Sequence, residues 1–304
     1  MTARDWFQKA RKEKWAIGAF NIDTLDIFKA VMVAAANKKA PVMVEFSPGE
    51  VKYFGLKNVV DMVVNAREEY KIPILLNLDH GKPVELVEEA IKIGSPSAHS
   101  TGSVQASSGS SSFDNVHFDG SDMEFKENIT ECKKIVDKAH KKGLLVEGEF
   151  DKVSGSSEKH EEDIDLEQLK NSYTKVGNAA KFVSETGVDI LASIFGNIHG
   201  TFPVQPDLDI DLLRQIQQAV PNTFLSLHGG SGITADQVKA AVAEGIVKVN
   251  VNTELRVAYK DALEEELGEN PKEYKVYKLT PDVIMAVASV VENKIDVFGS
   301  AGKI

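Results

Sequence analysis

The sequence holds a single cysteine, Cys132, among its 304 residues. That count excludes an internal disulfide and fits a reducing compartment. No apolar run reaches the roughly 18–20 residues that a membrane-spanning helix needs. Basic residues are fewer than acidic ones, 35 against 46, and the net charge of −11 argues against nucleic acid or an anionic membrane as a partner. Residues 1–15 are charged and amphipathic, unlike a signal peptide. We therefore expect a soluble, cytoplasmic protein.

Short apolar segments rich in β-branched residues recur along the chain, and segments with helical periodicity separate them. Continuous apolar runs are typical of parallel strands that are buried on both faces. The eight predicted strands span residues 15–22, 41–47, 74–79, 115–119, 144–150, 190–195, 223–228 and 247–252. The predicted helices span residues 25–37, 56–69, 83–93, 128–142, 166–186, 211–220 and 234–244, with a C-terminal pair from residue 254 onward.

Eight alternating strand and helix units predict an α/β fold in which a closed (β/α)₈ barrel, or TIM barrel, forms a single domain over residues 1–304. The length and the 42% hydrophobic content are sufficient for one such domain. A doubly wound open sheet would show the same alternation. Polar residues of functional character follow nearly all eight strands, however, whereas an open sheet concentrates its ligands at one switch point. This distribution favours the closed barrel.

Residues 95–112 interrupt the alternation, because nine of these eighteen residues are serine and none is charged. Such a composition is typical of a flexible linker. Without this segment, the helix that ends at residue 93 would lead into the strand at residue 115 through a short turn. We therefore predict a flexible insertion on the face of the barrel opposite the carboxyl ends of the strands, where it costs little closure entropy.

Three histidines, His80, His199 and His228, stand at or just past the ends of predicted strands, each beside a glycine. The carboxyl ends of the strands are where a (β/α)₈ barrel keeps its chemistry. Three neutral imidazoles that converge there make a Zn²⁺ site with open coordination positions, which is a catalytic arrangement. Taken singly, each is more simply read as a core or loop histidine. That simpler interpretation is kept for the remaining histidines, His99, His117, His140 and His160.

Carboxylates accompany the predicted metal site. Asp79 directly precedes the first histidine and is the candidate proton-transfer group. Glu147 and Glu149 alternate along the fifth predicted strand, so both face the barrel interior or neither does. Glu149, and likewise Asp119 at the end of the fourth strand, could orient a ligand histidine through a hydrogen bond or contact the metal itself.

Two consecutive loops predict a phosphate site. The sequence Gly-Gly-Ser-Gly at residues 229–232 follows the seventh strand, and Asn-Val-Asn-Thr at residues 250–253 ends the eighth. Glycine-rich turns at helix N-termini offer backbone N–H groups to an anion, and the loops after strands seven and eight are the recurrent phosphate site of this fold. A simple tight turn is the alternative interpretation of residues 229–232.

Residues 151–171 form a long polar stretch rich in serine and charged residues. Its composition and its position after the fifth strand predict a mobile lid that could bring in a general acid or base. The alternative interpretation is a plain surface loop.

With these motifs in place, the chain resembles the class II, metal-dependent ketose-bisphosphate aldolases over all of its length except residues 95–112. The matching stretches are Gly18-Ala19-Phe20-Asn21, Ser47-Pro48-Gly49-Glu50, Leu78-Asp79-His80-Gly81, Asp119-Gly120-Ser121, Val146-Glu147-Gly148-Glu149, Gly196-Asn197-Ile198-His199-Gly200, Leu227-His228-Gly229-Gly230-Ser231-Gly232 and Lys248-Val249-Asn250-Val251-Asn252-Thr253. So many ordered matches make the resemblance highly specific.

The resemblance implies a role for each matching residue. His80, His199 and His228 would bind Zn²⁺, and Asp79 would be the catalytic acid/base. A loop glutamate, for which Glu158 is the nearest match, would move the proton on the enediolate carbon. The dihydroxyacetone phosphate end of the substrate would be held by Gly200, Gly229, Ser231, Asn250 and Thr253. The other phosphate would be approached by Ser47 and Arg256, the latter reaching in from a neighbouring subunit.

The implied reaction is the reversible aldol cleavage of a ketose bisphosphate in glycolysis and gluconeogenesis. The metal would act as a Lewis acid on the ketone oxygen and stabilise the enediolate that forms when the C3–C4 bond breaks. Asp79 would take the C4 hydroxyl proton in cleavage and return it in condensation. Co²⁺ or Mn²⁺ could occupy the same ligands as Zn²⁺. A monovalent cation near the phosphate and a homodimeric or homotetrameric assembly are further implications of the resemblance.

Asn252 departs from the family pattern and leaves the substrate's C4 configuration open. Fructose-specific members often carry aspartate at this position, and tagatose-type members often carry alanine. Asparagine is closer to aspartate in size and polarity, and Arg256 is present, so we expect fructose 1,6-bisphosphate as the substrate. Tagatose 1,6-bisphosphate or another ketose bisphosphate is the alternative. The serine-rich segment 95–112 is the second departure.

Three rival interpretations remain. A class I aldolase needs a desolvated Schiff-base lysine inside the barrel, for which Lys248 on the eighth strand is the plausible candidate. A metal-dependent amidohydrolase is disfavoured because the first strand lacks a paired-histidine motif and the phosphate loops would be unexplained. A non-catalytic barrel that serves as a scaffold predicts the loss of at least one ligand, yet all three histidines and Asp79 are present.

Overall fold

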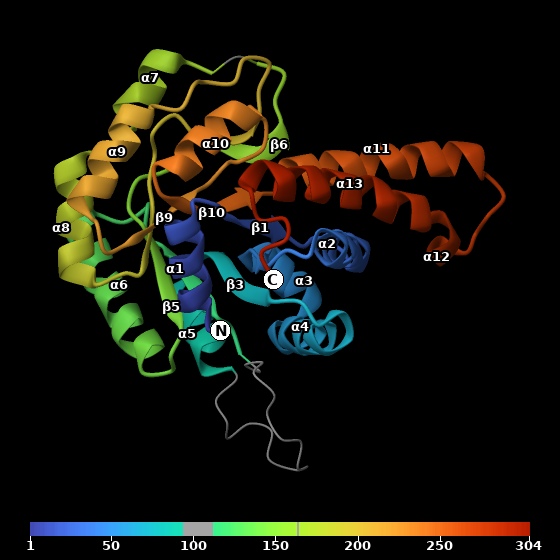
Figure 1. The fold of residues 1–304 in the computed structure, drawn as a ribbon, viewed down its shortest axis with the longest axis horizontal. Coiled ribbons are helices and arrows are strands. Elements are labelled where there is room, and N and C mark those ends of the chain that lie inside the picture. Colours follow the sequence, from blue (N-terminus) through green and yellow to red (C-terminus); the bar gives the residue numbers. More distant parts are fainter. Residues whose placement is uncertain (94–111, 163) are drawn as a thin grey trace, which may run out of the picture.

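Eight parallel strands close into a barrel in the computed structural model, which describes residues 1–93, 112–162 and 164–304 (Figure 1). Their order around the barrel is β1-β10-β9-β7-β5-β4-β3-β2. The strands are β1 (Ile17–Asn21), β2 (Val42–Phe46), β3 (Ile74–Gly81), β4 (Asn115–Asp119), β5 (Leu145–Glu149), β7 (Ile190–Ala192), β9 (Phe224–Leu227) and β10 (Ile246–Val251). Each predicted strand overlaps one of these, and the predicted closed (β/α)₈ barrel is confirmed.

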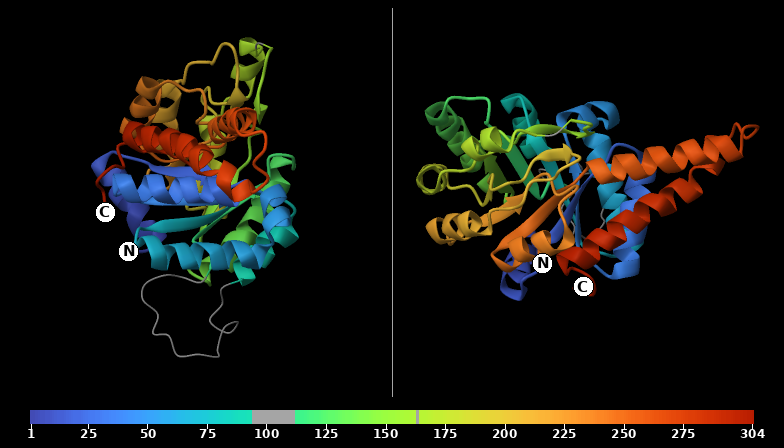
Figure 2. Two further views of the ribbon diagram at one scale, coloured as in Figure 1. Left: turned by 90° about the vertical axis from the view of Figure 1, so that its right-hand side faces the viewer. Right: turned by 90° about the horizontal axis from the view of Figure 1, so that it is seen from above.

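Helices surround this barrel, as the two views of Figure 2 show. They are α1 (Ala3–Glu13), α2 (Leu25–Lys38), α3 (Pro48–Phe54), α4 (Leu56–Tyr70), α5 (Val84–Lys92), α6 (Phe125–His140), α7 (Leu166–Asn171), α8 (Val176–Thr186), α9 (Ile210–Ala219), α10 (Ala235–Ala243), α11 (Thr253–Glu269), α12 (Val276–Leu279) and α13 (Pro281–Phe298). In α6, the buried residues Ile129, Cys132, Val136 and Ala139 recur at helical spacing, so one apolar stripe faces the sheet.

Helix α1 closes the end of the barrel at which the strands begin. Its side chains Trp6 and Phe7 pack with inward-facing strand residues such as Met43 and Phe224 in one buried cluster. The rings of Phe7 and Phe224 lie 5.5 Å apart. Apolar side chains therefore fill this end of the barrel. The cavity with polar side chains lies at the opposite end, where the strands finish.

The polar stretch 151–171 is more ordered than its composition predicts. Strand β6 (Gly155–Lys159) pairs in parallel with β8 (His199–Thr201), outside the barrel. The prediction of one helix over residues 166–186 is wrong, because α7 and α8 are separate helices. Between them, the backbone N–H of Thr174 donates to the Ile194 carbonyl (2.8 Å) instead of continuing a helix.

Most of the predicted insertion at residues 95–112 lies outside the described residues. Helix α5 ends at Lys92 and strand β4 begins at Asn115, at the end of the barrel where the strands start. Among the residues that the structure describes, no helix is both long enough and apolar enough to cross a membrane.

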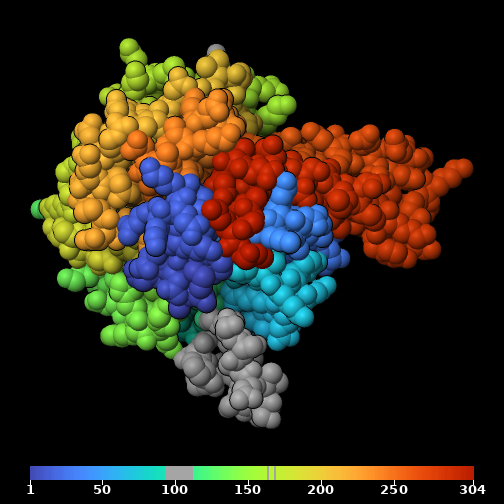
Figure 3. Space-filling model, in the orientation of Figure 1, coloured from blue at the N-terminus to red at the C-terminus, as the bar shows by residue number. Residues whose placement is uncertain are grey.

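The C-terminal helices form an arm. Helices α11 and α13 run beside each other and extend past the barrel, with α12 near the tip (Figure 1), and this arm projects from the rest of the molecule in Figure 3. Several large apolar side chains of this arm are exposed: Leu267, Tyr274, Val276, Tyr277 and Met285.

Candidate metal centre and active site

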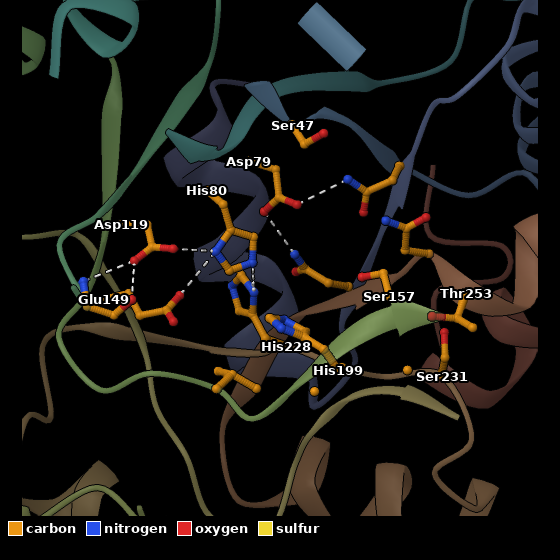
Figure 4. A pocket seen from close by; sticks show the side chains of 18 of the residues that line it. Ser47, Asp79, His80, Asp119, Glu149, Ser157, His199, His228, Ser231 and Thr253 are labelled. Carbon is orange, nitrogen blue, oxygen red and sulfur yellow. Dashed lines mark hydrogen bonds and ion pairs between the residues drawn. The ribbon is translucent and has the colours of Figure 1, made fainter. Parts of the chain in front are cut away.

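A cavity of about 330 Å³ opens where the barrel strands end. The candidate site residues predicted from the sequence line it, with the exception of Glu147, Glu158 and Lys248. These residues are Ser47, Asp79, His80, Asp119, Glu149, His199, Gly200, His228, Gly229, Ser231, Asn250, Asn252, Thr253 and Arg256. Figure 4 shows how the side chains of many of them approach one another. The cavity therefore brings together side chains from distant parts of the chain.

Two of the predicted ligands, His80 and His228, face each other. Asp119 Oδ2 lies 2.9 Å from His80 Nδ1, and Glu147 Oε1 lies 2.8 Å from His228 Nε2. These carboxylates bind one nitrogen of each ring, and the two remaining nitrogens face each other. These remaining nitrogens, His80 Nε2 and His228 Nδ1, lie 3.2 Å apart, within hydrogen-bond distance. Two ring nitrogens that converge in this way, each oriented from behind by a carboxylate, suit a bound cation.

The third predicted ligand, His199, stands at the start of β8. Its ring centroid lies 5.1 Å from that of His80 and 6.1 Å from that of His228. Burial and the neighbouring charges of His80 and His228 lower the pKa of His199 to about 3. Its imidazole is therefore neutral at physiological pH, which is the form that binds a metal ion. The donor set of three imidazoles fits Zn²⁺.

A fourth histidine belongs to the same cluster. His117 on β4 is fully buried, and its ring lies 4.7 Å from that of His80 and 5.0 Å from that of His228. One atom each from Asp79, His80, His117 and His228 lie within 4.8 Å of one another. From the sequence, His117 was expected to be a structural histidine because it lies within the fourth predicted strand. The sequence signal for its role is its position on the strand that follows the one carrying Asp79 and His80.

Asp79 is buried and oriented by two amides. Asn21 donates to Asp79 Oδ2 (3.1 Å), and Asn250 donates to Oδ1 (3.2 Å). Burial raises the pKa of Asp79, but the positive charges at His80 and Lys248 outweigh it and hold the pKa well below its ordinary value. Asp79 is therefore a carboxylate at neutral pH, ready to accept a proton from a group in the cavity.

Glu147 and Glu149 both face the barrel interior, as their alternation on β5 allows. Both are almost fully buried. Glu147 holds His228, while Glu149 Oε2 lies 3.5 Å from His80 Nδ1 and 3.2 Å from His117 Nε2. Asp119 is fixed in turn by the hydroxyl of Ser121 (2.6 Å). These carboxylates support the ligand histidines from behind.

The two predicted phosphate loops meet beside this cluster. Gly229 adopts a φ of +65°, and a Cβ at this position would lie 1.9 Å from the Ile198 carbonyl oxygen, so only glycine fits. Ser231 and Thr253 lie close together in Figure 4, and Thr253 is the first residue of α11. The positive end of the α11 dipole therefore faces the cavity, as an anion site requires.

Arg256 and Ser47 lie at another side of the cavity, and this chain supplies its own Arg256. The guanidinium binds Asp23 through Nε (2.6 Å) and Nη2 (2.9 Å). Nη2 also donates to Glu50 (3.2 Å), and Nη1 donates to the Ser157 carbonyl of β6 (3.2 Å). Ser47 is the N-cap of α3, where it forms a capping box with Glu50.

Glu158 is exposed on β6 and lies outside the cavity lining, whereas its neighbour Ser157 is part of that lining. The remaining described histidines are away from the cavity. His140 Nε2 binds Asp189 (2.8 Å), and the ring of His160 stacks on Phe202 at 4.1 Å.

Lys248, the candidate for a Schiff base, is fully buried between two carboxylates. Its Nζ lies 2.7 Å from Glu45 Oε1 and 2.8 Å from Glu147 Oε2. Burial lowers the pKa of Lys248, but Glu147 and Glu45 outweigh it and raise the pKa above its ordinary value. A buried, protonated ammonium cannot attack a carbonyl, so the geometry excludes the class I interpretation.

Known proteins match this chain over its whole length. The family model "Fructose-bisphosphate aldolase class-II" matches residues 1–303. A fructose-bisphosphate aldolase from Streptococcus pneumoniae is 35% identical, with 100% of this chain and 99% of that protein covered. One from Streptococcus pyogenes is 34% identical, with the same coverage.

Solved structures agree with this assignment. The crystal structure of the YdjI aldolase from Escherichia coli K12 is 28% identical and has a TM-score of 0.77, covering 100% of this chain and 98% of that one. A structure from Coccidioides immitis is 27% identical with a TM-score of 0.83, covering 99% and 97%. The resemblance seen in the sequence is confirmed, and the chain belongs to the class II fructose-bisphosphate aldolase family, whose members are metal-dependent lyases.

Proposed function

We propose that this protein catalyses the reversible aldol cleavage of fructose 1,6-bisphosphate to dihydroxyacetone phosphate and glyceraldehyde 3-phosphate, with Zn²⁺ held by His80, His199 and His228. The observation that carries the proposal is that the rings of His80, His199 and His228 lie near one another beside the carboxylate of Asp79, in a cavity that the two predicted phosphate loops also line. The names of the relatives support the same activity.

Different residues of this chain carry out different parts of the reaction. Bound Zn²⁺ supplies a Lewis acid that polarises the substrate carbonyl. Asp79 accepts the proton of the C4 hydroxyl, so that the C4–O bond becomes a carbonyl while the electrons of the C3–C4 bond pass to the three-carbon product. Asn21 and Asn250 hold the Asp79 carboxylate in place for this transfer.

The three-carbon product must then gain a proton at C3, and we propose Glu158 as the donor. Because Glu158 is exposed on β6, this role requires the strand to turn so that the carboxylate enters the cavity. A Glu158→Gln variant should slow exchange of the dihydroxyacetone phosphate C3 proton with solvent by at least tenfold. The exposed Glu161→Gln is the matched control. An unchanged exchange rate in Glu158→Gln would show that Glu158 is not the proton donor.

The substrate is tested by supplying fructose 1,6-bisphosphate and tagatose 1,6-bisphosphate in parallel and measuring triose phosphate release. We expect a higher kcat/KM for the fructose substrate, because Asn252 lines the cavity as a polar side chain. An Asn252→Asp variant should raise the ratio of the two kcat/KM values further. A preference for tagatose 1,6-bisphosphate would establish the alternative, and cleavage of neither substrate would contradict the proposed function.

The identity of the ion is part of the proposal. Three imidazole nitrogens suit Zn²⁺, while Co²⁺ and Mn²⁺ can occupy similar ligands. Metal analysis of protein purified without chelators should find one zinc per chain. Stoichiometric manganese or cobalt in place of zinc would change the ion that we propose but not its three histidine ligands.

We further propose that the protein works as a homodimer or homotetramer, with the C-terminal arm as the contact. The tyrosines near its tip, Tyr274 and Tyr277, are 87% and 71% exposed. Exposed aromatic side chains in one region mark a contact surface. Light scattering should find a multiple of the chain mass, and a Tyr274→Lys/Tyr277→Lys variant should shift it toward the monomer. A monomeric native protein would contradict this assignment.

A cytoplasmic location completes the proposal. Cys132 is buried as a free thiol, which fits a reducing compartment. Fractionation of cells that produce the protein should place it with cytoplasmic enzymes, and recovery outside the cytoplasm would contradict this location.

A further inference from the structure

The Asp79-His80 pair lies at an irregularity in the barrel. Strands β3 and β4 pair at Leu78 with Val116 and again at Gly81 with Phe118. Two residues of β3 therefore stand opposite one residue of β4. This two-against-one arrangement is a β-bulge, a feature that redirects side chains near functional sites. The single residue opposite the bulge, between Val116 and Phe118, is His117.

At the bulge, the predicted metal ligand His80 has an unusual backbone conformation. His80 has a φ of +44°, in the left-handed region that residues other than glycine rarely adopt. Such a conformation persists only where the surroundings enforce it. Gly81 allows the close approach that follows, since a Cβ there would lie 2.6 Å from the His117 carbonyl oxygen.

The His117 side chain holds this backbone. The backbone N–H of His80 donates to His117 Nδ1 at 3.0 Å, in place of a strand partner. Nδ1 accepts this hydrogen bond when the ring proton is on Nε2, which lies 3.2 Å from Glu149 Oε2, and Nδ1 also lies 3.5 Å from Asp79 Oδ1. His117 thus connects the backbone of His80 to a carboxylate that also lies near the His80 ring.

We propose that His117 is a positioning residue for the metal centre, fixing the left-handed backbone of His80 through Nδ1 so that the His80 ring meets the metal ion. The inference rests on the metal role of His80 in the proposed function. It goes beyond that function by assigning to His117 a part in setting metal affinity without being a ligand itself. Partners of this kind change metal affinity about 10–100-fold when they are lost.

Two amide variants separate this role from general packing. In His117→Asn, the side-chain oxygen can take the place of Nδ1 and accept the His80 N–H. In His117→Gln, the amide reaches the position of Nε2 and can bind Glu149, but leaves the His80 N–H without its acceptor. Phe118→Leu, at the buried neighbour on β4, is the control for loss of core packing.

The measurement is zinc affinity by competition with a chromophoric chelator, together with the absorption spectrum of the Co²⁺-substituted protein. We expect His117→Gln to lose at least tenfold in zinc affinity and to change the Co²⁺ spectrum. His117→Asn and Phe118→Leu should stay within about threefold of the native protein. Equal losses in the two amide variants, a greater loss in His117→Asn, or native affinity in His117→Gln would overturn the inference. Absence of zinc binding by the native protein would instead contradict the proposed function.

Discussion

Lys248 and His228 bind opposite oxygens of one carboxylate, that of Glu147. Lys248 Nζ lies 2.8 Å from Glu147 Oε2, and His228 Nε2 lies 2.8 Å from Oε1. All three side chains are buried. The lysine compensates the charge of a carboxylate that would otherwise be costly to bury, and the carboxylate orients a predicted metal ligand. Lys248 therefore helps, through Glu147, to position the predicted metal ligand His228.

Replacing Lys248 with methionine should weaken the metal centre and the fold together. The change leaves the buried carboxylates of Glu45 and Glu147 without their cation, which costs about 3–5 kcal/mol of unfolding free energy. Zinc affinity should fall about 10–100-fold because Glu147 loses its fixed position behind His228. Chelator competition and denaturant unfolding measure the two effects. Lys260→Met, at an exposed position of α11, should change neither.

The same geometry predicts that borohydride will not trap a substrate adduct. Incubation with dihydroxyacetone phosphate and borohydride should leave the mass of the chain unchanged, since Lys248 is protonated and buried between two carboxylates. A mass increase matching the reduced adduct at Lys248 would show that the class I mechanism operates after all.

Asp79→Asn should separate catalysis from metal binding. The amide keeps the size of the side chain but cannot accept the C4 hydroxyl proton, so kcat should fall about 10²–10⁴-fold. Zinc content should stay near that of the native protein, since the three histidines remain. Steady-state cleavage and metal analysis on the same preparation provide the test. An active Asp79→Asn variant would assign proton transfer to another group.

We expect Glu50 to make the free energy of unfolding depend on pH. Burial raises the pKa of Glu50 to about 9, from an ordinary value of 4.5, and its hydrogen bond with Asp23 adds to the shift. Between these values the folded protein keeps a proton that the unfolded chain has released. Unfolding then releases a proton, so this group makes the folded state less stable as pH rises from about 4.5 to 9.

Glu50→Gln removes that dependence, because glutamine resembles the protonated acid at every pH. From pH 6 to pH 8, the unfolding free energy of the variant relative to the native protein should rise, by at most about 1.4 kcal/mol per pH unit. Denaturant unfolding at several pH values measures the difference, with the exposed Glu68→Gln as the control. A difference independent of pH would show that Glu50 is ionised in the folded protein.

The barrel was predictable because its strands are short, rich in apolar residues and buried on both faces. Strand Ile246–Val251 is buried throughout, and Ile74–Gly81 is buried except at His80. Strand β6 gave no such signal, since Gly155–Lys159 is largely exposed and pairs with a segment some forty residues away. Its pairing with β8 depends on tertiary structure, which no local pattern encodes.

The site was predictable where glycine marked it. His80, His199 and His228 each adjoin a glycine, and all three line the cavity. His117 was missed because its role depends on the bulge in β3, which leaves the His80 N–H without a strand partner. The break between α7 and α8 was missed for a similar reason, because the Thr174 backbone bonds to a residue distant in sequence.

The most direct test of the central claim is fructose 1,6-bisphosphate cleavage followed through removal and return of the metal. The account predicts that EDTA treatment abolishes cleavage and that one equivalent of Zn²⁺ per chain restores it, because the three imidazoles make a single site. Cleavage that continues undiminished in protein shown to contain no metal would contradict the three-histidine mechanism.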